Sequence, residues 1–186
     1  MKLVAGLGNP GRKYEQTRHN VGFEVVQELV RRWAGGARPK DNFQAEMVDV
    51  VIGSERTILL CPQTFMNRSG QSIVQARDFY KLTNDDVLVV CDDFALPVGQ
   101  LRCRTKGSSG GQKGLEDTIR ALGTDAVPRL RIGIGPVPQA WVAADFVLSK
   151  FSAGERAAVN ESLERAVDAV ETWVKEGIAA CMNRYN

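Results

Sequence analysis

The chain of 186 residues is long enough for one domain with a sizeable hydrophobic core. Its 24 lysines and arginines against 22 aspartates and glutamates give a net charge of +2, which by itself does not indicate a nucleic-acid partner. No apolar run is long enough to span a bilayer, and the first one begins too early to leave room for a signal peptide. We therefore expect a cytoplasmic protein that does not cross a membrane.

Residue types that usually bind metals are scarce. The chain has one histidine and four cysteines without paired spacing, which are Cys61, Cys91, Cys103 and Cys181. Three of the cysteines lie in or beside apolar, strand-like runs, which is typical of reduced thiols in or near a core. We therefore expect no metal site.

Positive charge gathers in one segment, from Gln100 to Arg131. This segment holds seven basic and three acidic residues, a net charge of +4. Such a segment is compatible with a polyanionic partner. A solvated surface patch gives the same pattern, and charge alone favours that interpretation.

The first half of the chain predicts strands and helices in alternation. Residues 3–7 form a short apolar run typical of a buried strand, and Asn20 can cap a helix whose apolar residues recur with helical spacing to Trp33. A polar link follows at 35–42. Two strand-like runs, 47–52 and 57–61, are separated by Gly-Ser-Glu and predict a hairpin.

The middle of the chain predicts further elements. A loop over 62–70 ends in a helix that runs to about Lys81, and the continuous apolar run 87–91 indicates a central strand that ends in Asp92-Asp93. Residues 98–104 predict a strand with Arg102 and Arg104 on one face. A glycine-rich loop over 107–114, a short helix to Leu122 and a strand over 129–135 follow.

The last third is predicted to be helical. Ser152 and Glu155 form a capping box, after which one apolar face continues to Val174 and stops at Gly177. Strands precede, interleave with and then give way to helices. This order predicts one α/β domain over residues 1–186, with a central mixed sheet flanked by helices.

His19, the only histidine, lies in the polar loop between the first strand and the first helix. Loops at this position commonly carry the chemistry of α/β folds. Asp92, at the end of a buried strand, could accept a hydrogen bond from one imidazole nitrogen and leave the other free to take a proton. A structural histidine and a turn-capping aspartate are the alternatives.

Two glycine motifs suggest other functions. Residues 6–11 match the dinucleotide fingerprint G-x-G-x-x-G, but no helical pattern begins inside the motif and no acidic residue ends a second strand at the expected distance. Residues 107–111 match the nucleophile elbow G-x-S-x-G. In α/β-hydrolases the serine precedes the acid and the histidine, whereas here His19 and Asp92 precede Ser109.

With Ser109 set aside and no cysteine placed for attack, water becomes the expected nucleophile. His19 is then the candidate general base in the hydrolysis of an ester or amide. Such a reaction also needs polar groups to hold the scissile carbonyl and the water. Asn9 and Asn67 are candidates, although asparagine in a loop rich in proline and glycine is often only a turn former.

Five stretches, in order along the chain, resemble the motifs of the bacterial peptidyl-tRNA hydrolase family. The first is Gly-Leu-Gly-Asn-Pro-Gly with Tyr14, Thr-Arg-His-Asn and Gly-Phe. The others are 62–70, 92–104, 107–115 and 129–135. Together they cover essentially the whole chain.

The resemblance implies hydrolysis of the ester that joins peptide to tRNA in peptidyl-tRNA dropped from ribosomes. It implies no metal and no cofactor, a single α/β domain that is usually monomeric, and binding of the tRNA acceptor stem and 3′ end. By position, it implies that His19 is the general base, supported by Asp92, and that Asn9 distinguishes a blocked peptidyl ester from a free aminoacyl ester. It implies that the cleft is lined by Tyr14, Phe65 and Asn67. The basic residues that it implies to face the tRNA are Arg102, Arg104 and Arg131.

One departure from the family pattern lies at Gln112-Lys113, where the family commonly has His-Asn. The asparagine contacts substrate in the family, so its role cannot be copied to Lys113. We expect Lys113 to contribute to substrate binding. The departure also leaves open a catalytically inactive, RNA-binding relative, while the retained His19, Asp92, Asn9 and Asn67 favour the enzyme.

Overall fold

One seven-stranded sheet with the order β2-β3-β4-β1-β5-β7-β6 organises the computed structural model. The structure describes residues 1–35 and 37–186, so Gly36 of the predicted polar link lies outside the described residues. The strands are β1 (Lys2–Gly6), β2 (Lys40–Asn42), β3 (Ala45–Ile52), β4 (Glu55–Pro62), β5 (Val87–Pro97), β6 (Leu101–Arg104) and β7 (Arg129–Gly135).

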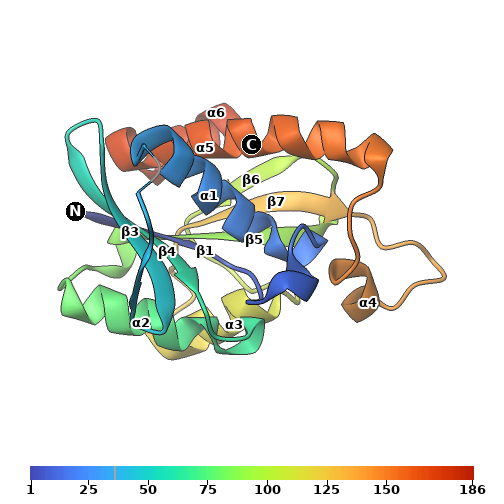
Figure 1. Cartoon of the computed structure of the whole chain (residues 1–186), viewed down its shortest axis with the longest axis horizontal. Coiled ribbons are helices and arrows are strands. Elements are labelled where there is room, and N and C mark those ends of the chain that lie inside the picture. The colour runs from blue at the N-terminus through green and yellow to red at the C-terminus, as the bar shows by residue number, and fades with distance from the viewer. Residues whose placement is uncertain (36) are drawn as a thin grey trace.

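Helices cover both faces of the sheet (Figure 1). They are α1 (Val21–Trp33), α2 (Ser69–Phe79), α3 (Lys113–Leu122), α4 (Ala143–Val147), α5 (Ala153–Glu176) and α6 (Ile178–Tyr185). Helices α1, α5 and α6 lie on one face and α2 and α3 on the other, while α4 lies at one end of the molecule. The two faces bury separate hydrophobic clusters.

The central strands are buried on both sides. Along β1, Val4 belongs to the cluster under α1 and α5, while Leu3 and Ala5 belong to the cluster under α2. Strand β1 runs parallel to β4 and β5, and β5 parallel to β7, whereas β2, β3 and β6 pair antiparallel with their neighbours. The predicted fold class, a single α/β domain around a mixed sheet, is confirmed.

Several predicted boundaries were wrong. Strand β5 does not end at Asp92-Asp93 but continues to Pro97, because its second half pairs with β7 after a shift of register. Strand β6 begins at Leu101 rather than Val98, and α2 ends at Phe79 rather than near Lys81. Strand β2 and helices α4 and α6 had no counterpart in the prediction.

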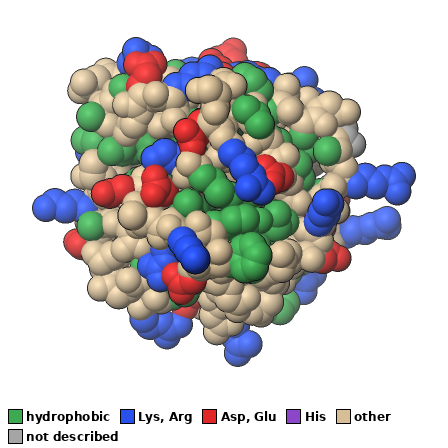
Figure 2. All heavy atoms as spheres, turned by 90° about the vertical axis from the view of Figure 1, so that its left-hand side faces the viewer, with side chains coloured by type: hydrophobic (Ala, Val, Ile, Leu, Met, Phe, Trp, Pro, Cys, Tyr) green, Lys and Arg blue, Asp and Glu red, His purple; other side chains and the backbone are tan. Residues whose placement is uncertain are grey.

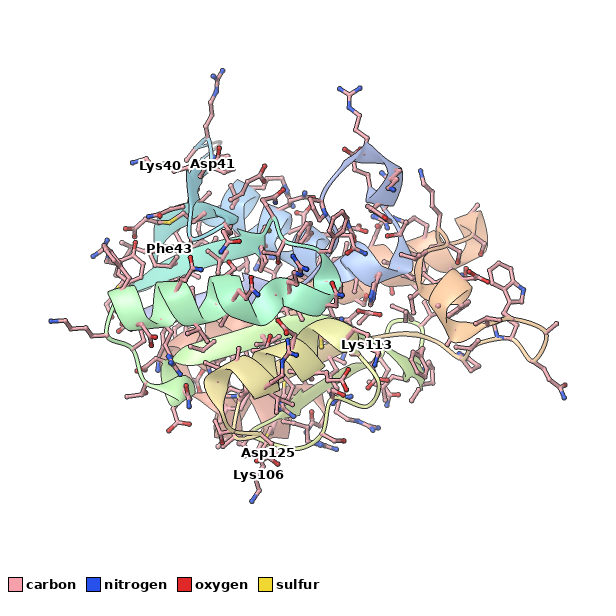
Figure 3. The ribbon with its side chains drawn as sticks, turned by 90° about the horizontal axis from the view of Figure 1, so that it is seen from below. Lys40, Asp41, Phe43, Lys106, Lys113 and Asp125 are labelled. Carbon is pink, nitrogen blue, oxygen red and sulfur yellow. The ribbon has the colours of Figure 1, made fainter. Side chains whose placement is uncertain are left out.

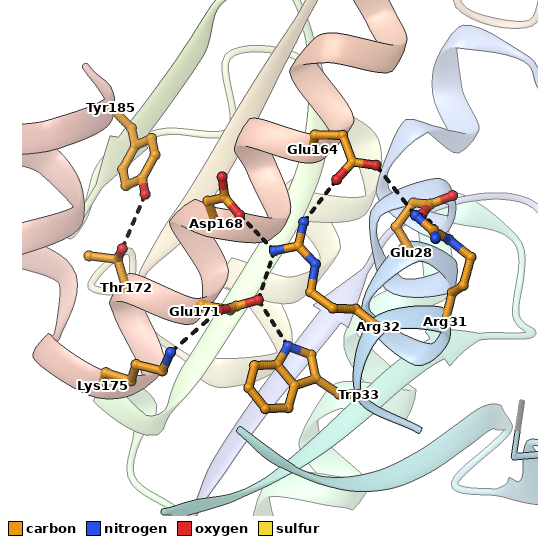
Figure 4. A network of polar contacts seen from close by, with 10 residues as sticks. All are labelled: Glu28, Arg31, Arg32, Trp33, Glu164, Asp168, Glu171, Thr172, Lys175 and Tyr185. Atoms are coloured by element: carbon orange, nitrogen blue, oxygen red, sulfur yellow. Dashed lines mark hydrogen bonds and ion pairs between the residues drawn. The ribbon is translucent and has the colours of Figure 1, made fainter. Parts of the chain in front are cut away.

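Polar contacts connect α1 and α5 at the surface (Figure 4). Arg32 donates to Glu164, Asp168 and Glu171 of α5 at 2.6–2.9 Å. Hydrogen bonds to Asp168 and Glu171 raise the pKa of Arg32 above its already high ordinary value. Exposed pairs of this kind contribute little each, so apolar packing beneath them supplies most of the attachment.

The end of the molecule opposite α4 carries charges of both signs. Figure 2 shows lysine and arginine side chains interspersed with aspartate and glutamate side chains around a group of hydrophobic ones.

Among the described residues, no helix is both long and apolar enough to cross a membrane.

Two glycines let α1 approach the sheet closely, next to the loop that carries His19. A Cβ atom at Gly22 would lie 2.5 Å from the Val90 carbonyl oxygen and 2.6 Å from the Leu7 nitrogen. A Cβ at Gly6 would overlap the Gly22 carbonyl. The position of the helix start, and therefore of the preceding loop, depends on this backbone contact.

We predict that Gly22→Ala destabilises the protein by about 1–3 kcal/mol, because the added methyl group forces the helix away from the sheet. Urea unfolding measures this change. Gly154→Ala is the control, since nothing lies within 4 Å of that position in α5, and it should be neutral or stabilising. Equal stability of the Gly22→Ala variant and the wild type would show that the helix and the sheet can separate without cost.

Candidate active site

His19 and Asp92 form a buried pair at the end of the sheet near α4. The Nδ1 atom of His19 lies 2.8 Å from Oδ2 of Asp92, and the two residues are 9% and 1% exposed. An ionised carboxylate only accepts hydrogen bonds, so Nδ1 carries the proton of a neutral imidazole. The lone pair is therefore on Nε2. The predicted contact between His19 and Asp92 is present.

A short 3₁₀ turn, Arg18–Asn20, presents His19 directly before α1. Asp92 comes from the middle of β5 rather than from its end. Gln112 supports the second oxygen of this carboxylate: its Nε2 donates to Oδ1 of Asp92 at 3.0 Å. Both oxygens of a buried carboxylate are therefore hydrogen-bonded, as burial of a charge requires.

Asn9 is fixed on three sides. Its Oδ1 accepts from the Met66 backbone N–H at 2.9 Å, and its backbone N–H and C=O pair with the side-chain amide of Asn20 at 2.8 and 2.9 Å. Asn20 therefore stands at the N-cap position of α1 but makes no capping hydrogen bond, contrary to our prediction. Because Oδ1 faces a donor, the amide of Asn9 presents its NH₂ group as the remaining donor.

A cavity of about 420 Å³ opens beside His19. Asn9, Phe65, Asn67, Asp92 and Lys113 also line it. Of these, Phe65 and Asn67 are the ones that the family resemblance assigned to the lining of a cleft. Tyr14 is not among the lining residues of this cavity. It lies half-buried in the turn Arg12–Tyr14, where Lys13 Nζ stands 4.7 Å from its ring centre.

Helix α4 supplies an apolar wall that the sequence-based prediction missed. Ala143, Ala144, Val147 and Leu148 line the cavity on this side. The helix has five residues and no side-chain cap, so its only signal is a short apolar run. Burial of Phe146 holds the helix against the rest of the protein.

Arg18 is a second residue that the prediction missed. It is 6% exposed and donates to both carboxylate oxygens of Glu155 at 3.0 and 2.8 Å, and to the Ile134 carbonyl at 3.1 Å. Its guanidinium also lies over the rings of Phe146 and Phe151 at 4.4 and 4.7 Å. The residue next to His19 is thereby fastened to α4 and to the start of α5.

The arginines of β6 and β7 lie side by side. Arg102 pairs with Arg131 and Arg104 with Arg129 in the antiparallel register, so all four share one face of the sheet. Arg129 is buried and donates to the carbonyls of Gly107 and Asp125 at 2.7 and 2.9 Å. Burial lowers its pKa.

Arg131 is also engaged within the protein. It pairs with Asp93 at 3.0 Å and donates to the Ser108 carbonyl at 2.6 Å. Arg102 and Arg104 are half-buried on the edge strand. Part of the basic segment therefore holds the glycine-rich loop in place, which its charge alone could not indicate.

Lys113 is the first residue of α3 and lines the cavity. Figure 3 shows it well apart from Lys106 and Asp125. Its side chain is 66% exposed, and Nζ contacts Glu116 at 2.9 Å. The ammonium group can therefore leave this exposed partner at little cost and meet a ligand.

Other nucleophiles are poorly placed. The Ser109 hydroxyl accepts from the Gly111 N–H at 3.3 Å, and Ser109 is not a lining residue of the cavity. All four cysteines are buried and free, and desolvation raises the pKa of Cys91 to about 12. Within 1–35 and 37–186, no group of three or more His, Cys, Asp or Glu side chains is arranged to hold a metal ion.

We predict that Glu155→Gln weakens the anchor of the His19 loop in a pH-dependent way. The Arg18 guanidinium lowers the pKa of Glu155 to about 2. A lowered pKa means that the pair stabilises the fold above the ordinary glutamate pKa and that this contribution is lost as the pH falls toward 2. The variant should lose about 1–3 kcal/mol at pH 7 and much less at pH 3.

Urea unfolding at the two pH values measures this difference. Glu161→Gln is the control, because Glu161 is exposed on the same helix. A loss of stability that is the same at pH 3 and pH 7 would contradict the assignment of the effect to the ion pair.

Known proteins resemble this chain over its full length. It is 51% identical over 186 residues to the peptidyl-tRNA hydrolase of Rhodopirellula baltica, with 100% of this chain and 97% of that protein covered. The peptidyl-tRNA hydrolase of Desulforamulus reducens is 46% identical, with 100% and 89% covered.

The three-dimensional comparison agrees. The crystal structure of peptidyl-tRNA hydrolase from Acinetobacter baumannii superposes with a TM-score of 0.92 at 34% identity, covering 100% of this chain and 94% of that one. The family model described as peptidyl-tRNA hydrolase matches residues 3–186. These matches show that the chain, with its buried His19–Asp92 pair at the wall of a cavity, belongs to the peptidyl-tRNA hydrolase family.

Proposed function

We propose that this protein hydrolyses the ester bond between peptide and tRNA in peptidyl-tRNA released from ribosomes. The observation that carries the proposal is the 2.8 Å contact between His19 Nδ1 and Asp92 Oδ2 at the wall of the cavity. It leaves Nε2 as a base toward the space where a substrate would lie. The relatives named above carry the same activity in their names.

In the proposed reaction, Nε2 of His19 takes a proton from water while the water oxygen attacks the ester carbonyl carbon. The bond from that carbon to the ribose oxygen then breaks, and the imidazolium returns its proton to the leaving oxygen. Asp92 stabilises the imidazolium between these two steps. The products are a peptide with a free carboxylate and a tRNA with a free terminal hydroxyl.

Asn9 can select for a blocked amine. Its NH₂ group remains as a donor at the wall of the cavity, because Oδ1 is already held by the Met66 N–H. A donor can bind the carbonyl of a peptide bond next to the ester, but it cannot bind the ammonium group of a free aminoacyl ester, which has only donors itself. We assign to Asn67, which also lines the cavity, a second polar contact with the substrate.

We further propose that the 3′ end of the tRNA lies along the rim of the cavity. Phe65 is 56% exposed there and offers an aromatic face to a base. Lys113 offers a mobile charge to a ribose oxygen or phosphate, and so contributes to binding more than to the chemical step. Tyr14 is a more distant candidate. Such a substrate implies a cytoplasmic protein, and we propose that it acts as a monomer of one domain without a cofactor.

We predict that the purified protein releases N-acetylated amino acid from N-acetyl-aminoacyl-tRNA and that His19→Ala slows this turnover by ~10²-fold or more. Asp92→Asn should also slow turnover, because a single amide oxygen cannot accept from both His19 and Gln112 and the charge that supports the imidazolium is lost. Filter binding of the same tRNA should change little in either variant. Single-turnover kinetics measure the chemical step.

Two outcomes would contradict the proposal. A wild-type protein that binds this tRNA but never releases the amino acid would be the inactive, RNA-binding relative. A His19→Ala variant with near-normal turnover would remove His19 from the mechanism.

We predict that replacing both Arg102 and Arg104 by alanine raises KM and lowers the salt dependence of tRNA binding. The slope should fall by about one unit for each phosphate that the protein no longer neutralises. The pair Arg56→Ala and Arg184→Ala is the control, because these exposed arginines carry the same charge on other surfaces and are paired with Asp49 and Glu176. A salt slope that changes equally in both double variants would assign the effect to net charge alone.

A further inference from the structure

Gln112 occupies the junction between the glycine-rich loop, α3 and the His19–Asp92 pair. It is 5% exposed, and both ends of its side-chain amide are used. Oε1 accepts from the Leu115 N–H at 2.6 Å, which caps α3, and Nε2 donates to Oδ1 of Asp92 at 3.0 Å. Because the Leu115 N–H can only donate, it fixes Oε1 on its side and directs the NH₂ group at Asp92.

Asp92 has one donor for each oxygen, and both donors come from outside its own strand. His19 serves Oδ2 from the layer that contains α1, and Gln112 serves Oδ1 from the start of α3. A carboxylate that is 1% exposed has no bulk water to replace a missing donor. Without Gln112, Oδ1 would keep a buried, unsatisfied charge, and the carboxylate would rotate away from His19 or take a proton.

Either change would reach His19. The imidazole keeps its proton on Nδ1 only while a carboxylate oxygen accepts from it, and only that tautomer leaves Nε2 as a base. We propose that Gln112 is a positioning residue of the hydrolytic reaction: its amide orients the Asp92 carboxylate, so that Asp92 in turn fixes His19. The inference rests on the proposed function for its kinetic test, but not for its structural one.

The same hydrogen bond explains how the chain can depart from the family at residues 112 and 113. Gln112 links the catalytic carboxylate to a helix start, so the amide is used inside the protein rather than offered to substrate. Lys113, one residue later, turns to the exposed rim. Position 112 therefore makes contacts inside the protein, whereas position 113 faces the solvent.

The decisive variant is Gln112→Glu. The new carboxyl group keeps an oxygen for the Leu115 N–H but puts a second oxygen against Oδ1 of Asp92. Two such carboxyl groups share one proton at low pH and lose it as the pH rises. While the proton is shared, the new group still donates to Asp92. Once the proton has left, the donor is gone and the two charges repel.

We therefore expect the ratio of kcat in this variant to kcat in the wild type to fall by about 10-fold or more as the pH rises. Removing the hydrogen-bond partners that orient the ligands of a metal site has effects of this size. KM should change little. The other ionisable groups around the pair are Cys91 and Asp93 of β5, Arg129 and Arg131 of β7, Lys113, Glu116, Asp117 and Arg120 of α3, and Arg18 beside His19. They are unchanged in both proteins, so they cancel in the ratio.

Thr118→Val is the matched control within the same helix. Thr118 is buried, and its hydroxyl donates to the Gly114 carbonyl at 2.7 Å without touching Asp92. It should lower the melting temperature while the pH profile stays that of the wild type. A pH-independent ratio for Gln112→Glu, or the same pH-dependent fall in Thr118→Val, would overturn the proposal.

A second measurement needs no substrate. His19 is the only histidine, so its ring nitrogens give a single set of ¹⁵N signals. In the neutral wild-type ring these signals should report the Nδ1–H tautomer. In Gln112→Met, which is similar in length but has no donor, they should report a mixture of tautomers, and Thr118→Val should resemble the wild type. An unchanged tautomer in Gln112→Met would overturn the proposal, whereas an inactive wild type with the expected tautomers would refute only the proposed hydrolysis.

Discussion

Burial of the Asp92 carboxylate is the constraint on which the rest of the site depends. A charge away from water needs a hydrogen-bond donor for each oxygen, and here the donors come from two different layers of the fold. Their positions are set by how closely α1 packs on β1 and by where α3 begins. The geometry of the proposed catalytic pair is therefore a result of the packing of the whole domain rather than of the loop that carries His19.

The loop itself is held by hydrogen bonds of the polar residues on either side of His19. Asn20 binds the backbone of Asn9, and Arg18 binds Glu155 with two parallel hydrogen bonds. In the role proposed for it, His19 benefits from a fixed position, because proton transfer depends steeply on distance and direction. Hydrogen bonds and an ion pair to distant segments provide this rigidity, since the loop has little apolar surface of its own.

Sequence reasoning predicted what is local and missed what is distant. The strand before His19, the hairpin, the β7 strand and the capping box at Ser152 all follow from short-range periodicity and turn residues. Arg18 gave no signal, because an arginine in a polar loop resembles a solvated cation and its partner lies 137 residues further along. The burial of Arg129 was hidden for the same reason, since the charge of a segment does not tell which of its cations face inward.

Residues 112 and 113 show the same limit within the site. From the sequence, both positions lie in a glycine-rich loop, and either side chain could face the substrate. The fold ends the loop at Gln112 and begins α3 at Lys113, so a helix start separates the two side chains. Gln112 points inward and contacts the Asp92 carboxylate and the Leu115 N–H, whereas Lys113 points into solvent. With the proposed roles, the exchange of residue types is tolerable, because position 112 requires a donor to Asp92 and position 113 requires only a side chain long enough to meet the ligand.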